Sequence, residues 1–296
     1  MTHRRPQNLV ALLWRLTCAL LSKHWLWLAA LLVVAVVVAL VVWRPAAPSV
    51  ATFNIQDYPQ SDEQAAGAFE LVGALEVDAV GVQEITDARH FERFTDDYLG
   101  EDWEVAFADQ RRVRHRVGLA FDSTDVELVE SRTHRETVVQ YGARATLEAH
   151  LRSESPFGAR TVRVFVVHLK AGGDHSAIRQ KQLRRLRPIV DEAVASDDDV
   201  VLMGDFNTTG PADVRAVDAL AESVGLEWTT RDIGCTAYWE PDDNCESSTL
   251  DHILATRSTD EVDAVGACES VGCESRHSCP IYVDNVSDHC PVRAEF

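Results

Sequence analysis

The stretch Val200-Val-Leu-Met-Gly-Asp-Phe-Asn207 ends a run of apolar residues with two polar side chains. The apolar part predicts a buried strand at 200–203, and Asp205 and Asn207 follow at its end. Strand ends and the loops after them are where open sheets assemble functional sites. A lone Gly-Asp-Phe-Asn segment is equally compatible with a simple turn, because these residue types favour turns. The stretch indicates a site only if other strands end in the same way.

The same arrangement, a polar side chain next to an apolar strand, recurs at Asn54, Glu84, His168, Asp251 and Asp288-His289. Each position alone is typical of a turn former or a packed core residue. Together they combine acids, amides and imidazoles, and no Ser or Cys nucleophile accompanies them. This combination favours metal-assisted hydrolysis.

Strands and helices alternate along the chain. A strand at 50–55 precedes a helix near Ser61, where Ser61 and Gln64 form a capping-box pattern, and a strand follows at 79–83. Two further helices are expected, one at 176–195 and one after Pro211, a residue suited to a first helical turn. Further strands are expected at 117–121, 145–151, 161–169, 253–255 and 292–296. This order predicts a mixed α/β fold in one large domain, residues 50–296.

The N-terminal residues predict a membrane segment. No charged residue occurs between Trp25 and Trp43, and as a helix this stretch spans roughly 28 Å, close to the thickness of a bilayer core. Because basic residues precede it, residues 1–24 are expected in the cytoplasm or at the interface, and the domain after linker 44–49 outside. The alternative is a signal peptide cut near Ala46-Ala47, which releases the domain.

The chain carries a formal charge of −19, and every residue before Asp57 is neutral or basic. Such an acidic domain disfavours a nucleic-acid partner on net charge, unless a local basic cleft compensates. Six of the seven cysteines lie in the last quarter of the chain, which predicts disulfides in an exported protein. Cys235 with Cys245 is the local pair that we expect. The set comprises Cys235, Cys245, Cys268, Cys273, Cys279 and Cys290.

Six short motifs occur in a fixed order: Phe53-Asn54-Ile55, Gly81-Val-Gln-Glu84, Val167-His168-Leu169, Gly204-Asp-Phe-Asn207, Leu250-Asp-His252 and Ser287-Asp-His289. This set resembles the endonuclease/exonuclease/phosphatase superfamily, which includes deoxyribonuclease-I-like nucleases, abasic-site endonucleases, sphingomyelinases and inositol phosphatases. The resemblance covers residues 50–296. It implies a four-layer αββα sandwich, in which two mixed β-sheets are flanked by helices.

The resemblance also implies the cofactor and the base. Glu84 would hold Mg²⁺, with Mn²⁺ as the alternative, and Asn54 and Asp288 would complete or support that site. His289 would be the general base, and Asp251 would fix its tautomer.

The remaining roles concern the phosphate. His168 would contact it or protonate the leaving oxygen, while Asp205 and Asn207 would orient the nucleophile and bind the phosphate. Lys170 and Arg114 are expected to meet anionic parts of the substrate. One departure from the family is Gln56, which stands where many members place an acidic residue.

Three functions remain open for a monomeric enzyme of this kind. An extracytoplasmic nuclease or other phosphodiesterase is favoured by the basic loop 111–116, whereas the basic helix 179–187 reads as a solvated surface. A phosphodiesterase or phosphatase acting on phospholipid headgroups or inositol phosphates is favoured by the anchor and the short linker. The third is an inactive, anchored binding module, against which the full set of site residues argues.

Overall fold

The computed structural model describes residues 25, 27, 29–34, 48–155, 158–196, 198–241, 244–259 and 261–296. The chain divides into two compact units, and the first comprises residues 1–46 with 155–158. In this unit Trp25, Trp27 and residues 29–34 are helical, and both tryptophan side chains are exposed. The rest of the predicted membrane span lies outside the described residues. Among the residues that are described, no helix has the length and hydropathy that crossing a bilayer requires.

The first sheet of the larger unit has six strands in the order β13-β14-β1-β2-β4-β3. β1 and β2 run parallel, and the other neighbours are antiparallel. Its strands are β1 (Val50–Asn54), β2 (Ala79–Ile85), β3 (Trp103–Phe107), β4 (Arg116–Asp122), β13 (Glu261–Ala264) and β14 (Val292–Glu295).

The second sheet also has six strands, in the order β5-β6-β7-β8-β12-β9. β7 and β8 run parallel, whereas β12 is antiparallel to both β8 and β9. Its strands are β5 (Glu127–His134), β6 (Thr146–Ser155), β7 (Gly158–His168), β8 (Asp199–Asp205), β9 (Glu227–Trp228) and β12 (Asp251–Ala255). Each sheet therefore contains a parallel pair near its middle.

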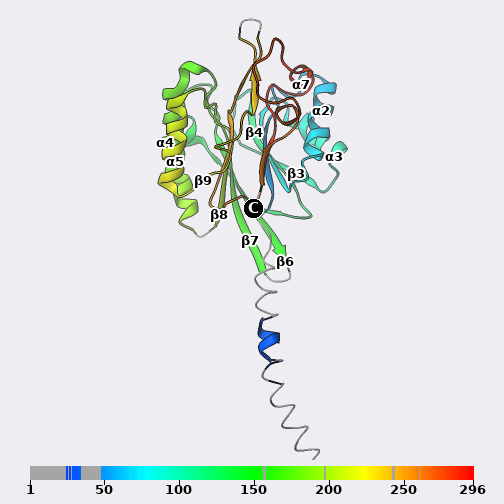
Figure 1. Cartoon of the computed structure of the whole chain (residues 1–296), viewed down its shortest axis with the longest axis vertical. Helices are drawn as coiled ribbons and strands as arrows, with labels where there is room; N and C mark the ends of the chain where they lie inside the picture. The colour runs from blue at the N-terminus through cyan, green and yellow to red at the C-terminus, as the bar shows by residue number, and fades with distance from the viewer. Residues whose placement is uncertain are drawn as a thin grey trace, which may run out of the picture. The chain divides into compact units, whose positions relative to one another are not determined.

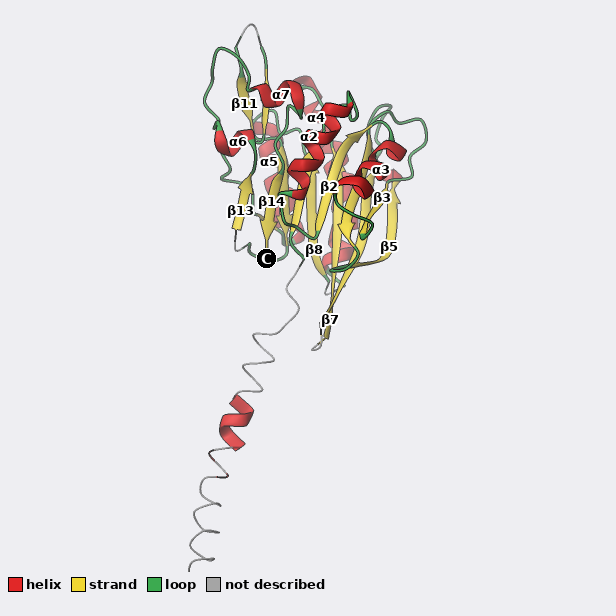
Figure 2. Cartoon of the chain, turned by 90° about the vertical axis from the view of Figure 1, so that its right-hand side faces the viewer, coloured by secondary structure: helices red, strands yellow, loops and turns green. Residues whose placement is uncertain are grey.

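The two sheets pack face to face, and buried aliphatic side chains such as Leu119, Val166 and Met203 fill the space between them. Helices α2 (Asp62–Gly73) and α3 (Ala88–Tyr98) cover the outer face of the first sheet (Figure 2). Helices α4 (Ser176–Val194) and α5 (Pro211–Val224) cover the outer face of the second (Figure 1). The structure thus has the predicted sandwich of two mixed sheets with helices outside.

Helices α2, α4 and α5 confirm the sequence patterns, whereas α3 was not predicted. Ser61 caps α2 by accepting a hydrogen bond from the backbone N–H of Gln64. The Gln64 side chain, however, accepts from the N–H of Gln60 instead of Ser61, so the capping box is displaced by one residue. Short 3₁₀ turns, η1 (Arg135–Thr137) and η2 (Gly173–His175), precede β6 and α4.

A two-stranded ribbon, β10 (Ala237–Trp239) with β11 (Glu246–Ser248), lies outside both sheets. Three disulfides surround it: Cys235–Cys273, Cys245–Cys279 and Cys268–Cys290. All six predicted cysteines are paired, but the expected Cys235–Cys245 bond is wrong. The ribbon pairs Ala237 with Ser248, and in that register Cys235 and Cys245 are not opposite each other.

The segment 266–284 contains two short helices. They are α6 (Ala267–Ser270) and α7 (Ile281–Asn285). Both are one turn or little more, and two of the disulfides end between them, at Cys273 and Cys279.

The strand order brings the polar strand ends to one edge of the sandwich. Asn54, His168 and Asp205 end β1, β7 and β8, and Glu84 lies one residue before the end of β2. β12 and β14 run antiparallel to their neighbours β8 and β1, so their first residues reach this same edge. Asp251 therefore lies opposite Asp205 in the sheet ladder.

Candidate active site

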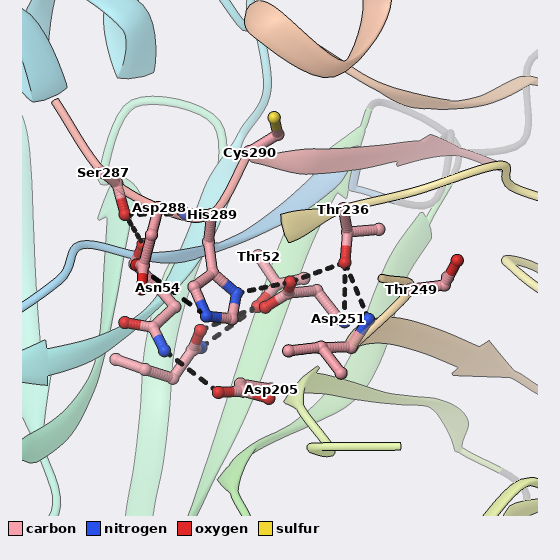
Figure 3. A network of polar contacts seen from close by, with 12 residues as sticks. Thr52, Asn54, Asp205, Thr236, Thr249, Asp251, Ser287, Asp288, His289 and Cys290 are labelled. Carbon is pink, nitrogen blue, oxygen red and sulfur yellow. Dashed lines mark hydrogen bonds and ion pairs between the residues drawn. The ribbon is translucent and has the colours of Figure 1, made fainter. Parts of the chain in front are cut away.

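Asp205 links the two sheets at the centre of the site. Its Oδ2 accepts a hydrogen bond from the side-chain amide of Asn54 at 3.0 Å (Figure 3). The same oxygen accepts a hydrogen bond from the side-chain amide of Asn207 at 2.9 Å. Its Oδ1 accepts the backbone N–H of Asn207 at 2.8 Å. The preceding Gly204 has φ of 140°, and a Cβ there would lie 2.0 Å from the Val167 carbonyl oxygen. Only glycine fits, which explains its place before Asp205.

His289 and Asp251 form a buried pair beside Asp205. His289 Nδ1 lies 2.7 Å from Asp251 Oδ2, which also accepts a hydrogen bond from the Thr236 hydroxyl at 2.7 Å (Figure 3). Because the carboxylate can only accept, the hydrogen-bond network places a proton on Nδ1, so that in the neutral form of the ring Nε2 is the nitrogen that can accept a proton. The pair has the geometry of a general base with its orienting carboxylate.

Ser287 fixes the backbone that carries His289. Its hydroxyl donates to the Asn54 carbonyl oxygen at 2.7 Å and accepts the backbone N–H of His289 at 3.1 Å. The Tyr282 hydroxyl donates to the His289 carbonyl oxygen at 2.8 Å. The base is therefore anchored to the end of β1 as well as to Asp251.

Burial and charge act against each other on the titrating groups. Burial lowers the pKa of His289, but the Asp251 and Asp288 carboxylates outweigh it and hold the pKa well above its ordinary value. Burial raises the pKa of Asp205 to about 7, against the opposing effect of His289. Burial also raises the pKa of Asp288, with a contribution from Glu84. The site thus concentrates carboxyl groups whose ionised forms a bound cation would stabilise.

An irregularity in β2 turns the Glu84 side chain toward these titrating residues. The register between β2 and β4 shifts between Val82 and Ile85, and Glu84 has φ of 64°. Such bulges redirect a side chain next to many active sites, and the left-handed conformation costs about 1–3 kcal/mol in a residue other than glycine. Glu84 Oε2 accepts the backbone N–H of Asp57 at 3.1 Å.

His168 is fully buried between the acidic groups. Its Nε2 lies 3.3 Å from Asp205 Oδ2 and 3.7 Å from Glu84 Oε1, yet neither ring nitrogen has a hydrogen-bond partner of suitable geometry among the described residues. Burial, reinforced by the charge of Arg144, holds the pKa of His168 well below its ordinary value. Burial therefore favours the neutral form of the His168 imidazole, which lies behind the residues that line the cavity described below.

The donor set suits a hard divalent cation. Three buried carbonyl or carboxylate oxygens have no hydrogen-bond partner among the described residues: Asn54 Oδ1, Asp251 Oδ1 and Asp288 Oδ1. Oxygens of this kind are the ligands that Mg²⁺ prefers. Gln56, the departure from the family pattern, donates from its amide to Asp288 Oδ2 at 3.0 Å and so orients that carboxylate.

Sequence reasoning missed several residues around the site. Asp57, Glu84 and His115 offer ligating atoms within 4.8 Å of one another. His115 Nε2 lies 2.6 Å from Asp57 Oδ1, and Arg144 donates to His115 Nδ1 at 3.0 Å. His115, Arg144 and Asp57 all lie outside the strand-end pattern. The nearest signal in the sequence was the basic loop that contains His115.

A cavity of about 430 Å³ opens onto the site. Its wall includes the half-exposed Trp239 and the buried Tyr238 of β10, both unassigned from the sequence. Lys170 and Arg114, predicted to bind substrate, do not line it. Arg114 is instead mostly exposed and pairs with Asp57 at 2.9 Å. The predicted residues that line the cavity are Glu84, Asp205, Asn207, Asp288 and His289.

Arg179 is the exception to the predicted solvated basic helix, because the other basic residues at 181–187 are exposed. Its side chain is 1% exposed and forms a two-pronged ion pair with Asp213, at 2.7 and 3.1 Å. It also donates to the carbonyl oxygens of Lys170 and Gly172, at 2.8 and 2.7 Å. Arg179 therefore holds the loop after His168, two residues of which line the cavity.

Solved structures share this fold. A D. rerio TDP2 humanized by 14 mutations is 18% identical, covering 84% of this chain and 98% of that chain, with a TM-score of 0.65. The human Nocturnin catalytic domain is 17% identical, covering 85% and 94%, with a TM-score of 0.62. A Bacteroides thetaiotaomicron mannosyl-6-phosphatase is 15% identical, covering 84% and 99%, with a TM-score of 0.59. At these identities the likeness establishes the fold alone.

No curated protein matches the sequence. Residues 51–289, however, match the endonuclease/exonuclease/phosphatase family as one continuous region. This region contains every motif on which the resemblance rests. The chain therefore belongs to the endonuclease/exonuclease/phosphatase family.

Proposed function

We propose that this chain is a metal-dependent phosphoester hydrolase in which His289 activates the attacking water. One observation carries the proposal: the buried His289–Asp251 pair adjoins the same cavity as Glu84 and Asp288. A positioned imidazole base and an oxygen-rich cation site within one cavity are the two parts that this chemistry needs.

In this mechanism His289 Nε2 takes a proton from water, and Asp251 stabilises the imidazolium that forms. Asp205, fixed by three hydrogen bonds, orients the water. Both amide hydrogens of Asn207 are used by Asp205 and by the Leu169 carbonyl oxygen, so Asn207 acts through Asp205. Neutral His168 donates a ring N–H to a phosphate oxygen.

Glu84, Asn54 and Asp288 are the proposed ligands of Mg²⁺, with Mn²⁺ as the alternative. The unpartnered oxygens of Asn54 and Asp288 support this assignment. When bound, the cation neutralises charge on the phosphate oxygens and the leaving group.

The three disulfides support a location outside the cytoplasm. We propose that residues 25–43 anchor the chain in the cytoplasmic membrane, with residues 1–24 inside, 44–49 as the linker and 50–296 as a monomeric catalytic domain. Cleavage after the anchor, with secretion of the domain, is the alternative.

The proposed substrate is a phosphodiester, with nucleic acid as the first candidate. A related structure is described as D. rerio TDP2 complexed with single strand DNA product, at 17% identity. A phospholipid headgroup or an inositol phosphate is the alternative, which the short linker to the anchor supports.

The test uses the purified full chain with Mg²⁺ or Mn²⁺. Substrates are bis(p-nitrophenyl) phosphate, DNA, RNA, inositol phosphates and phospholipid vesicles, each with and without chelator. We expect chelator or Glu84→Gln to abolish hydrolysis, and His289→Ala to lower kcat by about 10²- to 10⁴-fold.

The matched control is His277→Ala, at an exposed histidine of the C-terminal segment, which should retain full activity. Hydrolysis that survives both the chelator and His289→Ala would contradict the mechanism. Inactivity toward every phosphoester would instead support the inactive binding module.

A further inference from the structure

A second cavity, of about 450 Å³, is formed by two loops, residues 110–115 before β4 and residues 138–144 before β6. We call it the arginine cavity. Its described lining contains no carboxylate, although the chain carries a formal charge of −19. A concentration of cations in an otherwise acidic protein marks a place where an anion is bound. The arginines that line it are Arg111, Arg112, Arg114 and Arg144.

The two loops are tied together in the folded protein. The Gln110 side chain donates to the Ala143 carbonyl oxygen at 3.0 Å and accepts the Ala145 N–H at 2.7 Å. Arg135 donates twice to the Asp109 carbonyl oxygen, at 3.0 and 2.8 Å. The walls of the cavity are therefore held in place without a ligand, which lowers the cost of binding one.

The arginine cavity is connected to the candidate active site through two side chains. Arg144 donates to His115 Nδ1 at 3.0 Å, and the same nitrogen lies 3.8 Å from Glu84 Oε1. Both Arg144 and His115 line the cavity. A substrate whose scissile phosphate lies at Glu84 could therefore place its neighbouring groups in the arginine cavity.

The exposed side chains of the cavity indicate which groups those are. Arg111 and Arg112 are exposed, and among the described residues neither has an acidic partner within 4.0 Å. Tyr141, in the opposite loop, is 97% exposed. Cations that follow a backbone, next to an aromatic ring on which a base can stack, are the features that bind single-stranded nucleic acid.

We propose that the arginine cavity binds a single nucleic-acid strand next to the scissile phosphate, with Arg111 and Arg112 on its phosphates and Tyr141 stacked on a base. This proposal rests on the phosphoester hydrolase function proposed above and names its substrate class. It also reconciles an acidic protein with a polyanionic substrate, because the attraction is local.

The test compares two substrates on the full chain: a single-stranded oligodeoxynucleotide and bis(p-nitrophenyl) phosphate, which has one phosphate. Arg111→Gln/Arg112→Gln and Tyr141→Ala should each raise KM for the oligonucleotide about tenfold more than KM for the small ester. The double arginine variant should also reduce the slope of log Kd against log[salt] by about 1–2. The control, Arg185→Gln/Arg187→Gln on the exposed side of α4, should leave both quantities unchanged.

Binding is measured separately from hydrolysis, by fluorescence anisotropy of a labelled oligonucleotide on the His289→Ala chain. If the arginine and tyrosine variants raise a salt-dependent Kd, the result supports strand binding in the arginine cavity. This holds even if the unmodified chain hydrolyses no ester, a result that would contradict only the proposed catalysis. Equal effects on both substrates, or no change in Kd, would overturn the strand assignment. So would a larger loss on vesicles of phosphatidylinositol bisphosphate than on the oligonucleotide, since that would assign the cavity to a lipid headgroup.

Discussion

Asp251 has two hydrogen-bonding partners, and the contact with His289 sets the reactivity of the base. With one oxygen held by Thr236 and by His289, the carboxylate cannot turn away from the imidazole. Its charge is the largest of the effects that raise the pKa of His289 against burial. The affinity of the base for a proton therefore depends more on Asp251 than on any other neighbouring side chain.

We predict that Asp251→Asn lowers the maximal rate by about 10²-fold or more, because the preferred tautomer of His289 is lost. Removing the negative charge lowers the pKa of His289, so the acidic limb of the pH profile of kcat/KM moves to lower pH. Asp232→Asn, at an exposed carboxylate, serves as the control. A variant with a reduced rate but an unshifted acidic limb would show that Asp251 does not tune the base.

The residues of this centre differ in how far the sequence predicts them. Asp205 and His168 follow apolar strands, and that pattern needs no knowledge of the fold. Thr236 and His115 lie in loops, and their partners are 15 and 58 positions away in the chain. Nothing local distinguishes such a threonine or histidine from any other, because its role is created by the packing of distant segments.

Helices α4 and α5 are joined by one buried ion pair. Besides its bonds to Arg179, Asp213 accepts the Ser176 hydroxyl at 2.7 Å, at the first residue of α4. The periodicity of α4 predicted its length but not this contact. Arg179 lies within a run of basic residues, and only the position of α5 decides that this one is buried.

We predict that Arg179→Met destabilises the protein by about 3–5 kcal/mol, since Asp213 would remain buried without a cation. The double variant Arg179→Met/Asp213→Leu should recover most of that loss, as measured by urea unfolding. Arg185→Met, on the exposed side of α4, should change stability little. A double variant as unstable as Arg179→Met alone would refute the ion pair as the cause.

Two other elements could not be predicted from sequence patterns. The ribbon β10–β11 was not predicted, and its register, which no local signal sets, excluded the expected Cys235–Cys245 bond. Strand β5, with mostly exposed residues at the edge of its sheet, lacks the alternation that would identify it. The buried strands could be predicted because a buried strand is a run of apolar residues.

The disulfides bear on the site as well as on stability. Cys290 directly follows His289, and its backbone N–H donates to the Thr236 carbonyl oxygen at 2.7 Å, while Thr236 itself holds Asp251. Cys268–Cys290 therefore adjoins His289, and Cys235–Cys273 adjoins Thr236, the residue that holds Asp251.

We predict that Cys268→Ala/Cys290→Ala destabilises the protein by about 3 kcal/mol and lowers kcat more than tenfold. Cys245→Ala/Cys279→Ala is the matched control, because it closes a loop of similar length farther along the chain from His289 and Thr236. Thermal unfolding and kcat are measured for both variants. Equal losses of kcat would mean that the disulfides act through stability alone.

For the molecule as a whole, the alternation of strands and helices predicted only a mixed α/β fold. The sandwich of two sheets was implied by the family resemblance that the motifs carry, and the structure confirms it. The N-terminal anchor stays a prediction, as do the roles of the site residues. The arginine cavity could not be foreseen, since two loops must meet to form it.

The two halves of the sandwich follow one plan, because β1–α2–β2 and β7–α4–β8 are both crossovers between parallel neighbours. Asn54 and Glu84 come from one half, His168 and Asp205 from the other. The candidate active site therefore lies between the two halves and forms only when they pack against each other. Loops of either half can change in sequence while the strand ends of both halves keep the reacting side chains in place. The same architecture can therefore accept a different ester and hydrolyse it with the same residues.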